Sequence, residues 1–180
     1  MYQDVTLDPN LDNDMVEVFP YIFISNWYSS NNPQQLKKNN IKAVVTVETN
    51  PKSPNILKYY KNNGIDFMYL YAADVPFYPI EIYFDRSYDF INKHVSRGQN
   101  VLIHCYAGVS RSSTIILNYI IRKLYEGNYM IKLCPCNVLK YALNIIREHR
   151  NIINPNKGFI KDLLLKAKEY QKKYGGKECN

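Results

Sequence analysis

Short apolar runs rich in β-branched residues alternate with amphipathic segments along most of this chain, and this alternation restricts the fold more than any other feature of the sequence. The apolar runs predict strands at residues 21–26, 41–48, 65–72 and 100–105. The amphipathic segments predict helices at residues 32–40, 56–64, 80–98, 111–124, 138–150 and 158–170. Strands that alternate with helices favour parallel pairing, because a parallel strand is reached through a crossover. We therefore predict an α/β fold: a central, mostly parallel sheet of four to five strands flanked by helices.

The length and charge of the chain are typical of one domain with an anionic partner. A chain of 180 residues is long enough for one sheet with helices on both faces. Residues 1–19 contain five acidic and no basic side chains, so the rest of the chain is more basic than the overall net charge of +7. A basic body suits phosphate esters, nucleic acids or acidic lipids, and the alternative is a lysine-rich solvated surface. We expect three parts: an acidic segment at residues 1–15, either flexible or folded back on the body, a domain at residues 16–172 and a frayed tail at residues 173–180.

The sequence predicts neither a membrane span nor a metal site. The longest apolar run, at residues 115–121, is far too short to cross a bilayer and is interrupted by Asn118. The N-terminal residues lack the apolar core of a signal peptide, so we expect a cytoplasmic location, with the nucleus as the alternative. The cysteines, at positions 105, 134, 136 and 179, form no zinc-binding pattern. We expect Cys134 and Cys136 to be free thiols, and we predict no metal and no cofactor.

A cysteine lies at the end of the last predicted strand, where a tight turn leads into a helix. In open α/β sheets, ligands bind at the carboxyl ends of the strands, where the next helices begin. Cys105 is at such an end, and Gly108 permits a backbone conformation that other residues resist. A turn of this kind directs successive backbone N–H groups at one point, and the helix N-terminus adds positive charge. We therefore expect an anion, such as a phosphate group, to bind here.

The side chains of this turn suit phosphate chemistry. Arg111 offers a planar fork to two phosphate oxygens, and the positive field of the turn favours the ionised form of the Cys105 thiol. Ser112 can donate a hydrogen bond to that sulfur, and we expect His104 to order the loop rather than to act as a base. The nucleotide-binding P-loop is excluded, because that motif needs a lysine before its Ser or Thr and this turn has none. A buried structural cysteine would leave the residues around it unexplained.

The segment HCYAGVSRS, at residues 104–112, resembles the H-C-x-x-G-x-x-R-[ST] signature of cysteine-dependent phosphatases, and its ending resembles the dual-specificity branch of that family. The stretches NNIKAVVTV and NPNKGF resemble further segments of the family, so that the likeness covers residues 16–170. The resemblance implies a dual-specificity phosphatase-like fold, with residues 16–172 as the catalytic domain. It also implies a phosphorylated protein as the substrate, with phosphotyrosine, phosphoserine or phosphothreonine as the reacting residue.

The resemblance assigns roles to the residues of the turn. Cys105 is expected to be the nucleophile that forms a phosphocysteine intermediate, and Arg111 to bind the phosphate. Ser112 is expected to help the thiolate leave in the second step, and His104 to support the loop. The remaining phosphate contacts are expected from the loop residues Tyr106, Ala107, Gly108, Val109 and Ser110.

The leaving group needs a proton donor, and this should be a carboxyl group on a neighbouring loop. By resemblance, Asp74 is the general acid, since it follows the strand predicted at residues 65–72. Glu81 and Asp85 are the next candidates, but they fall within the following helix. Arg150 matches an arginine that helps some relatives to hold the substrate, and the alternative for this residue is a surface or structural ion pair.

Three functions compete. A protein phosphatase is favoured over a phosphatase for a phosphoinositide or an RNA 5′ end. The loop lacks the lysines typical of phosphoinositide phosphatases, and it has Ser110 where RNA-directed relatives often have asparagine. A phospho-binding protein without activity is disfavoured, because Cys105, Arg111 and Asp74 are all present. We therefore expect a phosphorylated protein as the partner and no nucleic acid, and the sequence leaves the oligomeric state open.

Overall fold

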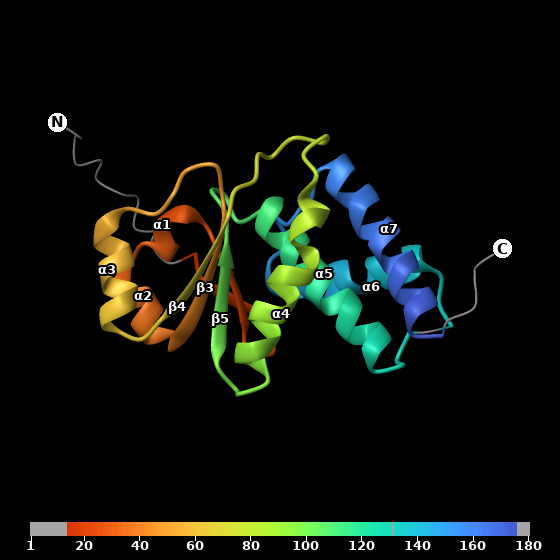
Figure 1. Cartoon of the computed structure of the whole chain (residues 1–180), viewed down its shortest axis with the longest axis horizontal. Coiled ribbons are helices and arrows are strands. Elements are labelled where there is room, and N and C mark those ends of the chain that lie inside the picture. Colours follow the sequence, from red (N-terminus) through yellow and green to blue (C-terminus); the bar gives the residue numbers. More distant parts are fainter. Residues whose placement is uncertain (1–13, 131, 176–180) are drawn as a thin grey trace.

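A five-stranded sheet forms the centre of the computed structural model, which describes residues 14–130 and 132–175 (Figure 1). The strands are β1 (Val16–Phe19), β2 (Ile22–Ser25), β3 (Ile41–Val47), β4 (Asp66–Leu70) and β5 (Asn100–His104). They lie in the order β1-β2-β5-β3-β4. The strand β1 runs antiparallel to β2, whereas all other neighbours are parallel. The predicted fold class, a mostly parallel sheet flanked by helices, is confirmed.

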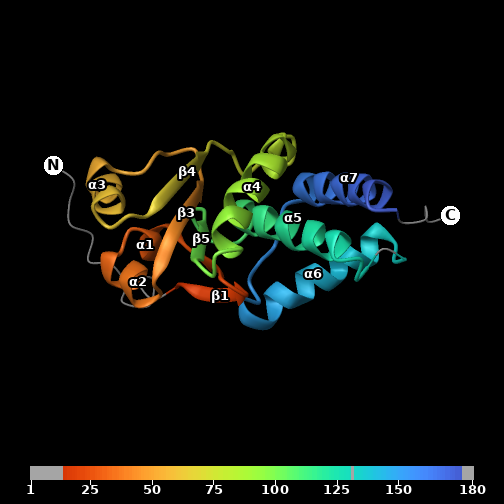
Figure 2. The ribbon, with the colours of Figure 1, turned by 60° about the horizontal axis from the view of Figure 1, so that its bottom comes forward.

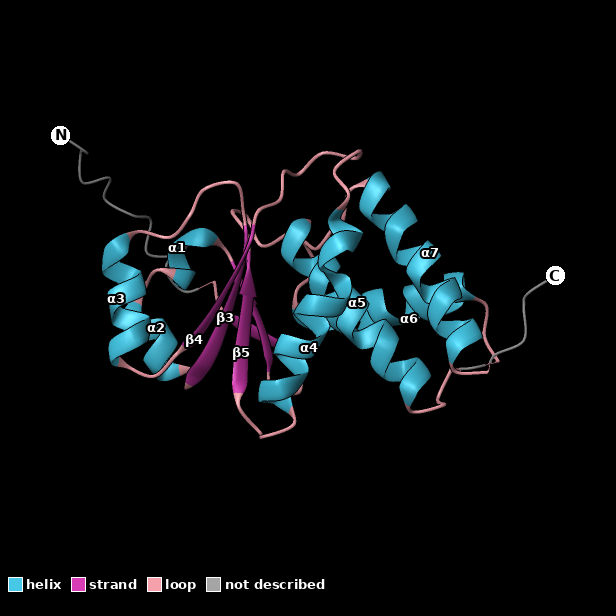
Figure 3. Ribbon diagram, in the orientation of Figure 1, coloured by secondary structure: helices cyan, strands magenta, loops and turns pink. Residues whose placement is uncertain are grey.

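Helices cover both faces of this sheet (Figures 1 and 3). One face carries α1 (Trp27–Ser30), α2 (Pro33–Lys38) and α3 (Pro54–Asn62). The opposite side carries α4 (Phe84–Val95), α5 (Arg111–Glu126), α6 (Pro135–His149) and α7 (Lys157–Lys173), with the short 3-10 segment η1 (Ile80–Tyr83) before α4. The six predicted helices are all present. The sequence analysis did not predict β1 or α1, and it assigned η1 to the helix that follows it.

The strands place alternate side chains on opposite faces of the sheet, which gives the domain two apolar cores. Phe23 and Leu102 face the core under α2 and α3, which also contains Tyr60. Their neighbours in β2 and β5, Ile22 and Ile103 among them, face the larger core on the other side. The register of β2 against β5 pairs Phe23 with Leu102, so that equivalent residues of the two strands share a face.

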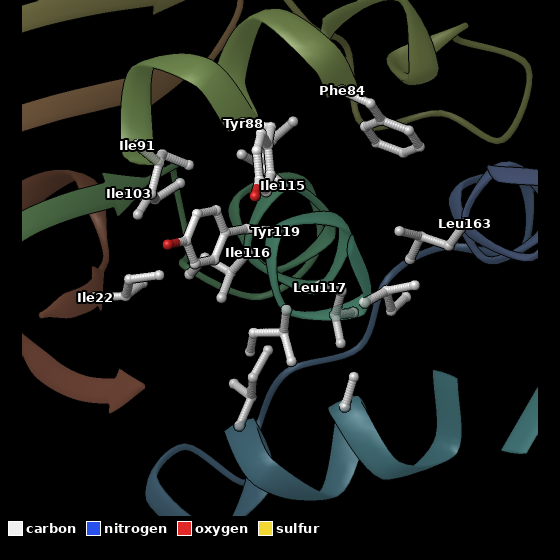
Figure 4. Packing of buried hydrophobic residues seen from close by; sticks show 14 of the residues in the cluster. Ile22, Phe84, Tyr88, Ile91, Ile103, Ile115, Ile116, Leu117, Tyr119 and Leu163 are labelled. Atoms are coloured by element: carbon white, nitrogen blue, oxygen red, sulfur yellow. The ribbon is translucent and has the colours of Figure 1, made fainter. Parts of the chain in front are cut away.

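The helix α5 is the centre of the larger core. Figure 4 shows Ile115 and Tyr119 of α5 next to Tyr88 of α4 and the strand residue Ile103, with Leu163 of α7 on another side. All residues of α5 up to Ile121 are buried, polar ones such as Ser113 and Asn118 included, because other elements cover this helix on every side. A helix held on every side has a fixed N-terminus, and this N-terminus lies within the segment HCYAGVSRS.

The ends of the described chain lie against the folded body. Figure 2 shows β1 beside α6, and directly before β1 the Asp14 carboxylate pairs with Arg150 at 2.6 Å. At the other end, α7 continues to Lys173 and the Tyr174 hydroxyl donates to Glu126 at 3.0 Å. Residues 14–15, the described part of the acidic segment, thus lie against the body, as in the second of the two expected arrangements, and residues 173–174 of the predicted frayed tail also lie against it. Residues 1–13 and 176–180 lie outside the described part of the chain.

Two features of the cysteines and helices bear on the sequence predictions. Cys105 and Cys136 are free thiols, whereas Cys134 takes part in a disulfide. The prediction of a free thiol is therefore wrong for Cys134. Across the described residues, no helix has the length and apolar character that a membrane crossing needs.

Candidate active site

Cys105 opens a tight loop that connects β5 to α5 at the carboxyl edge of the sheet. Four successive carbonyl groups of this loop, those of residues 106–109, accept hydrogen bonds from outside it. The backbone N–H of Trp27 donates to Tyr106 and that of Asn154 to Val109, at 2.8 and 2.9 Å. The Arg150 side chain donates to Ala107 and Gly108, at 3.2 and 2.9 Å. Every peptide bond of the described chain is trans, so each N–H points away from the carbonyl of its own peptide unit. The N–H groups of residues 107–110 are therefore directed to the inner side of the loop, where an anion would accept them.

Gly108 is the residue that makes this turn possible. Its φ angle is +66°, in the left-handed region that other residues avoid. A Cβ atom at this position would lie 2.5 Å from the carbonyl oxygen of Ser25, at the end of β2. The loop therefore needs glycine both for its backbone conformation and for its close approach to the neighbouring strand.

The Cys105 sulfur lies beneath this loop with 1% of the residue exposed. The Ser112 hydroxyl, in the first turn of α5, donates a hydrogen bond to the sulfur at 3.2 Å. The first N–H groups of a helix have no intrahelical acceptor, so the start of α5 also directs positive partial charge at this place. This arrangement favours a negative charge on the sulfur or on a bound anion.

His104 is a supporting residue without charge. Its Nδ1 atom lies 3.2 Å from the Cys105 carbonyl, and its Nε2 atom lies 2.7 Å from the Thr46 hydroxyl. Because a carbonyl oxygen only accepts, Nδ1 carries the proton and Nε2 accepts from Thr46. Complete burial, and then the nearby Lys52 charge, lower the pKa of His104 well below its usual value. A neutral imidazole with a hydrogen bond at each ring nitrogen orders the loop and is poorly placed to act as a base.

Lys52 connects the loop after β3 to α1, beside this histidine. Its ammonium donates to Ser30 at 2.7 Å and to Asn31 at 3.0 Å, and it lies 4.4 Å from the centre of the Trp27 ring. Burial lowers the pKa of Lys52 to about 7, although the Glu48 carboxylate opposes this shift. Lys52 thus fixes the segment that contains Trp27. The backbone N–H of Trp27 in turn donates to the Tyr106 carbonyl of the loop.

Arg111 is anchored along one edge of its guanidinium. The Nη1 atom donates to Glu48 at 2.5 Å and to the Ala72 carbonyl at 3.3 Å, and both charged side chains are almost completely buried. The Nε atom is buried as well, but it donates to no acceptor among the described residues. A buried donor without a partner is rare, and the missing partner here fits a phosphate oxygen.

Asp74 lies at the mouth of the loop, on the segment that follows β4. Its Oδ1 atom accepts from the Ser110 hydroxyl at 2.7 Å and from the Asn156 side-chain amide at 2.9 Å. Its Oδ2 atom lies 3.8 Å from Nε of Arg111. The structure therefore brings Asp74 to the same point as Arg111. Of the other candidate donors, Asp85 instead pairs with Lys166 at 3.2 Å.

A glycine at the start of α7 lets the Asp74 segment approach that helix. A Cβ atom on Gly158 would lie 1.7 Å from the carbonyl oxygen of Pro76. Asn156, at the N-cap of α7, accepts the N–H of Phe159 at 3.1 Å and donates to Asp74 with its other side-chain atom. The N-terminus of α7 therefore determines where the Asp74 carboxyl group lies.

Arg150 contacts the loop from the outside. Its guanidinium donates to the carbonyls of Ala107 and Gly108 and forms a two-pronged pair with the Asp14 carboxylate, at 2.6 and 2.8 Å. This position differs from the predicted one, in which Arg150 binds substrate. The observed contacts are those of the alternative, a structural ion pair.

Sequence reasoning missed several residues that position this site, among them Asp14, Glu48 and Asn156. Glu48 lies directly after β3, in the same position relative to its strand as Cys105 has to β5, and this was a usable signal. Asn156 was visible only as part of the NPNKGF stretch, and Asp14 only as one acid among several.

Comparison with known sequences identifies relatives of this chain. Residues 22–169 match the family described as "Dual specificity phosphatase, catalytic domain". The chain is 29% identical over 153 residues to mouse dual specificity protein phosphatase 15, and 30% identical over 153 residues to human dual specificity protein phosphatase 26. These matches cover 85% and 84% of this chain, but only 57% and 66% of the relatives. The chain therefore corresponds to part of each of these proteins.

Solved structures show the same arrangement of elements. The crystal structure of DUSP15 has a TM-score of 0.72 at 25% identity, covering 90% of this chain and 95% of that chain. The Yvh1 phosphatase domain from Chaetomium thermophilum has a TM-score of 0.73 at 21% identity, covering 84% and 94%. The second likeness concerns the fold alone.

Proposed function

The chain belongs to the dual specificity phosphatase family, and on that premise we propose that it hydrolyses phosphate monoesters on protein side chains. The proposed substrates carry phosphotyrosine, phosphoserine or phosphothreonine. A reducing compartment preserves a thiol nucleophile, so the cytoplasm or the nucleus is the proposed location, and the Cys134 disulfide is an exception to the reduced state usual there.

One observation carries this proposal: a buried thiol lies under a loop with inward N–H groups, beside an arginine whose Nε has no acceptor among the described residues. The Cys105 sulfur accepts from Ser112 at 3.2 Å, and Nε of Arg111 has no acceptor among the described residues. A phosphate group in the loop would complete these hydrogen bonds and would lie against the sulfur. The transition state gains the most from such donors, because negative charge grows on the oxygens that they face.

In the proposed first step, the Cys105 thiolate attacks phosphorus. The S–P bond forms while the bond between phosphorus and the side-chain oxygen of the substrate breaks. The protonated Asp74 carboxyl gives its proton to that departing oxygen. The products are the free hydroxyl of the substrate and a phosphocysteine, with Arg111 and the loop N–H groups holding its three oxygens.

In the proposed second step, water attacks the phosphocysteine. Asp74, now ionised, accepts a proton from this water, and the S–P bond breaks to release inorganic phosphate. The departing sulfur takes the electron pair of that bond, and the Ser112 hydroxyl stabilises the resulting thiolate by its hydrogen bond. Arg150 acts as a positioning residue in this proposal, because it holds two loop carbonyls in place.

The nucleophile assignment is tested by two matched cysteine variants. Cys105→Ser is expected to lose at least about 10³-fold in kcat/KM for a phosphotyrosine peptide, because a serine hydroxyl is not ionised at neutral pH. Cys136→Ser, which changes the exposed free thiol, is expected to retain full activity. Retained turnover by Cys105→Ser would refute the mechanism.

The substrate class is tested by a panel of three kinds of phosphate ester. We expect phosphotyrosine and phosphothreonine peptides to be turned over faster than an inositol phosphate or an RNA 5′-triphosphate, since the loop adds no charged side chain besides Arg111. Faster hydrolysis of inositol phosphate or RNA would replace the protein substrate with that class. Binding of phosphopeptide without any turnover would instead indicate a phospho-binding protein.

A further inference from the structure

A small pocket opens beside the loop that follows Cys105, next to Arg150. Its lining includes Asp14, Tyr28, Tyr106, Arg150 and Ile152, and its volume is about 270 Å³. This cavity, the Tyr106 pocket, is slightly smaller than the pockets of about 300 to 1,000 Å³ that hold drug-sized ligands, and it has room for one side chain.

The floor of the Tyr106 pocket has no donor left for an anion. A guanidinium has five N–H donors, and all five of Arg150 have acceptors. Nε donates to the Gly108 carbonyl, and Nη1 donates to the carbonyl and the carboxylate of Asp14. Nη2 donates to the Asp14 carboxylate and to the Ala107 carbonyl. The Asp14 carboxylate also accepts the backbone N–H of Asn26 at 2.9 Å. A phosphate group placed here would find no free guanidinium donor on Arg150 and would face the negative charge of Asp14. The floor is therefore a neutral, saturated ion pair.

The walls of the Tyr106 pocket are apolar and open to solvent. Tyr106 is 55% exposed and Ile152 is 52% exposed, although both side chains are large and apolar. The half-buried Tyr28 lies next to Tyr106, with ring centres 6.4 Å apart. Exposed apolar residues that gather around one cavity mark a binding site more often than scattered ones do.

The pocket shares a wall with the phosphate loop. Ala107 belongs to the lining of the pocket and is only two residues after Cys105. Consecutive Cα atoms lie about 3.8 Å apart, so Ala107 lies within about 8 Å of Cys105 along the chain. An extended peptide advances about 3.3 Å per residue, so a substrate residue next to the phosphorylated one, or one further along, reaches this distance.

We propose that the Tyr106 pocket binds one uncharged apolar side chain, aliphatic or aromatic, located one or two positions from the phosphorylated residue of a protein substrate. This inference rests on the proposed phosphatase function. It makes Tyr28, Tyr106 and Ile152 specificity-determining residues, and it excludes a second phosphate group as the preferred occupant.

The test compares phosphotyrosine peptides in a Gly-Ser background that carry leucine, glycine or phosphoserine at each of the two positions on either side. The wild-type protein is expected to prefer leucine over glycine by at least about ten-fold in kcat/KM at one position, since an apolar pocket discriminates to this degree. The phosphoserine peptide is expected to be no better than the glycine peptide. Equal kcat/KM for leucine and glycine at all four positions, or a preference for phosphoserine, would overturn the inference.

Two variants assign the preference to the pocket. Ile152→Ala is expected to reduce the leucine-to-glycine ratio to about two-fold, with the glycine peptide as the internal reference for folding and chemistry. Leu165→Ala, which truncates an equally exposed apolar side chain on α7, is expected to leave the ratio unchanged. An unchanged ratio in Ile152→Ala would refute the location of the subsite.

The same experiment separates the inference from the proposed function. p-Nitrophenyl phosphate reports on the loop alone, because it has no flanking residues. If neither this ester nor any peptide is hydrolysed, the proposed phosphatase function fails. If the ester is hydrolysed but the flanking residue has no effect, the phosphatase function stands and the pocket inference is wrong.

Discussion

At the scale of single residues, the two oxygens of Asp74 have different surroundings. Oδ1 accepts from Ser110 and Asn156, which are neutral donors, whereas Oδ2 faces Arg111 at 3.8 Å without a hydrogen bond. The first oxygen fixes the orientation of the carboxyl group, and the second one is directed toward the place where Arg111 would hold a phosphate group. This asymmetry suits a residue that must give and take a proton at one defined point.

Replacement of Asp74 tests this role through the leaving group. Asp74→Asn is expected to lower kcat for a phosphotyrosine peptide by about 10²–10⁴-fold, the typical contribution of general acid catalysis. The loss is expected to be much smaller for p-nitrophenyl phosphate, because an acidic phenol leaves without protonation. The measurement is kcat for both substrates, with Asp89→Asn, an exposed carboxyl on α4, as the control. Equal losses on both substrates would contradict a proton-donor role.

How far the sequence predicted the site follows from how local each contact is. Cys105, Gly108, Arg111 and Ser112 lie within one short stretch, so the sequence motif alone indicates that they act together. Their partners come from distant parts of the chain: Glu48 is 63 residues from Arg111, and Asn156 is 82 residues from Asp74. No periodicity or composition encodes such a pair, because only the strand order and the packing of α7 bring the two residues together.

At the scale of elements, the Asp74 segment is positioned by its close contact with the start of α7. Gly158→Ala tests this contact, since the added Cβ would lie 1.7 Å from the Pro76 carbonyl oxygen and the segment must move. Helix propensity alone would make this change stabilising by about 1 kcal/mol. We expect the opposite, a lower melting temperature together with a loss of activity that is larger for a phosphotyrosine peptide than for p-nitrophenyl phosphate. Lys157→Ala, at the neighbouring exposed position, is the control, and a Gly158→Ala protein with unchanged kinetics would show that the segment is not held here.

A pair of carboxyl groups joins η1 to α7 close to the same place. Burial, and then the charge and hydrogen bond of Glu81, raise the pKa of Asp162 from 3.8 to about 6. A group whose pKa is raised on folding stabilises the folded state below the unfolded value, and this stabilisation is lost as the pH rises through the folded value. The protein should therefore lose stability between pH 4 and pH 6 at this contact, because two carboxylates then face each other.

Replacement of one carboxyl group reveals this pH dependence. Asp162→Asn keeps a neutral donor next to Glu81, so its melting temperature is expected to exceed that of the wild type at pH 7.5 by a few degrees. The difference is expected to shrink toward pH 5, where Asp162 is itself protonated. Thermal unfolding at the two pH values measures this, with Asp89→Asn as the control. A difference that does not change with pH would rule out a titrating pair at this contact.

The elements that the sequence did not predict are short ones with unusual turns. The strand β1 has four residues, too few for a clear alternation, and its connection to β2 places Tyr21 at a φ of +65°. Hairpin turns at positive φ normally show glycine or asparagine, so tyrosine gave no signal. The Tyr21 N–H donates instead to the Glu17 side chain at 2.9 Å. The strands β3 and β5 were predicted because burial on both faces makes them nearly continuous apolar runs, whereas β4, a mostly half-buried edge strand, was predicted from its apolar and aromatic residues.

At the scale of the whole molecule, an ion pair joins two residues that are 136 positions apart in the sequence, and it contacts the loop that follows Cys105. Asp14, before β1, pairs with Arg150, after α6, and Arg150 in turn holds two loop carbonyls. The Arg150 side chain is 6% exposed, and the Asp14 carboxylate compensates its positive charge. The ion pair therefore joins the N-terminal edge of the sheet, the helical layer and the loop in one contact.

Asp14→Asn removes the charge of this contact but keeps its shape. The free energy of unfolding is expected to fall on the order of 3 kcal/mol, because an almost buried arginine loses its counter-ion. Urea denaturation measures this, with Glu169→Asn as the control, since the Glu169 carboxylate is mostly exposed and should change stability by less than about 1 kcal/mol. If Arg150 also holds the loop in its anion-binding shape, the variant must bind vanadate more weakly even where it is fully folded. Lower stability with unchanged vanadate affinity would mean that the pair closes the domain without shaping the loop, and Arg150 would then have no positioning role.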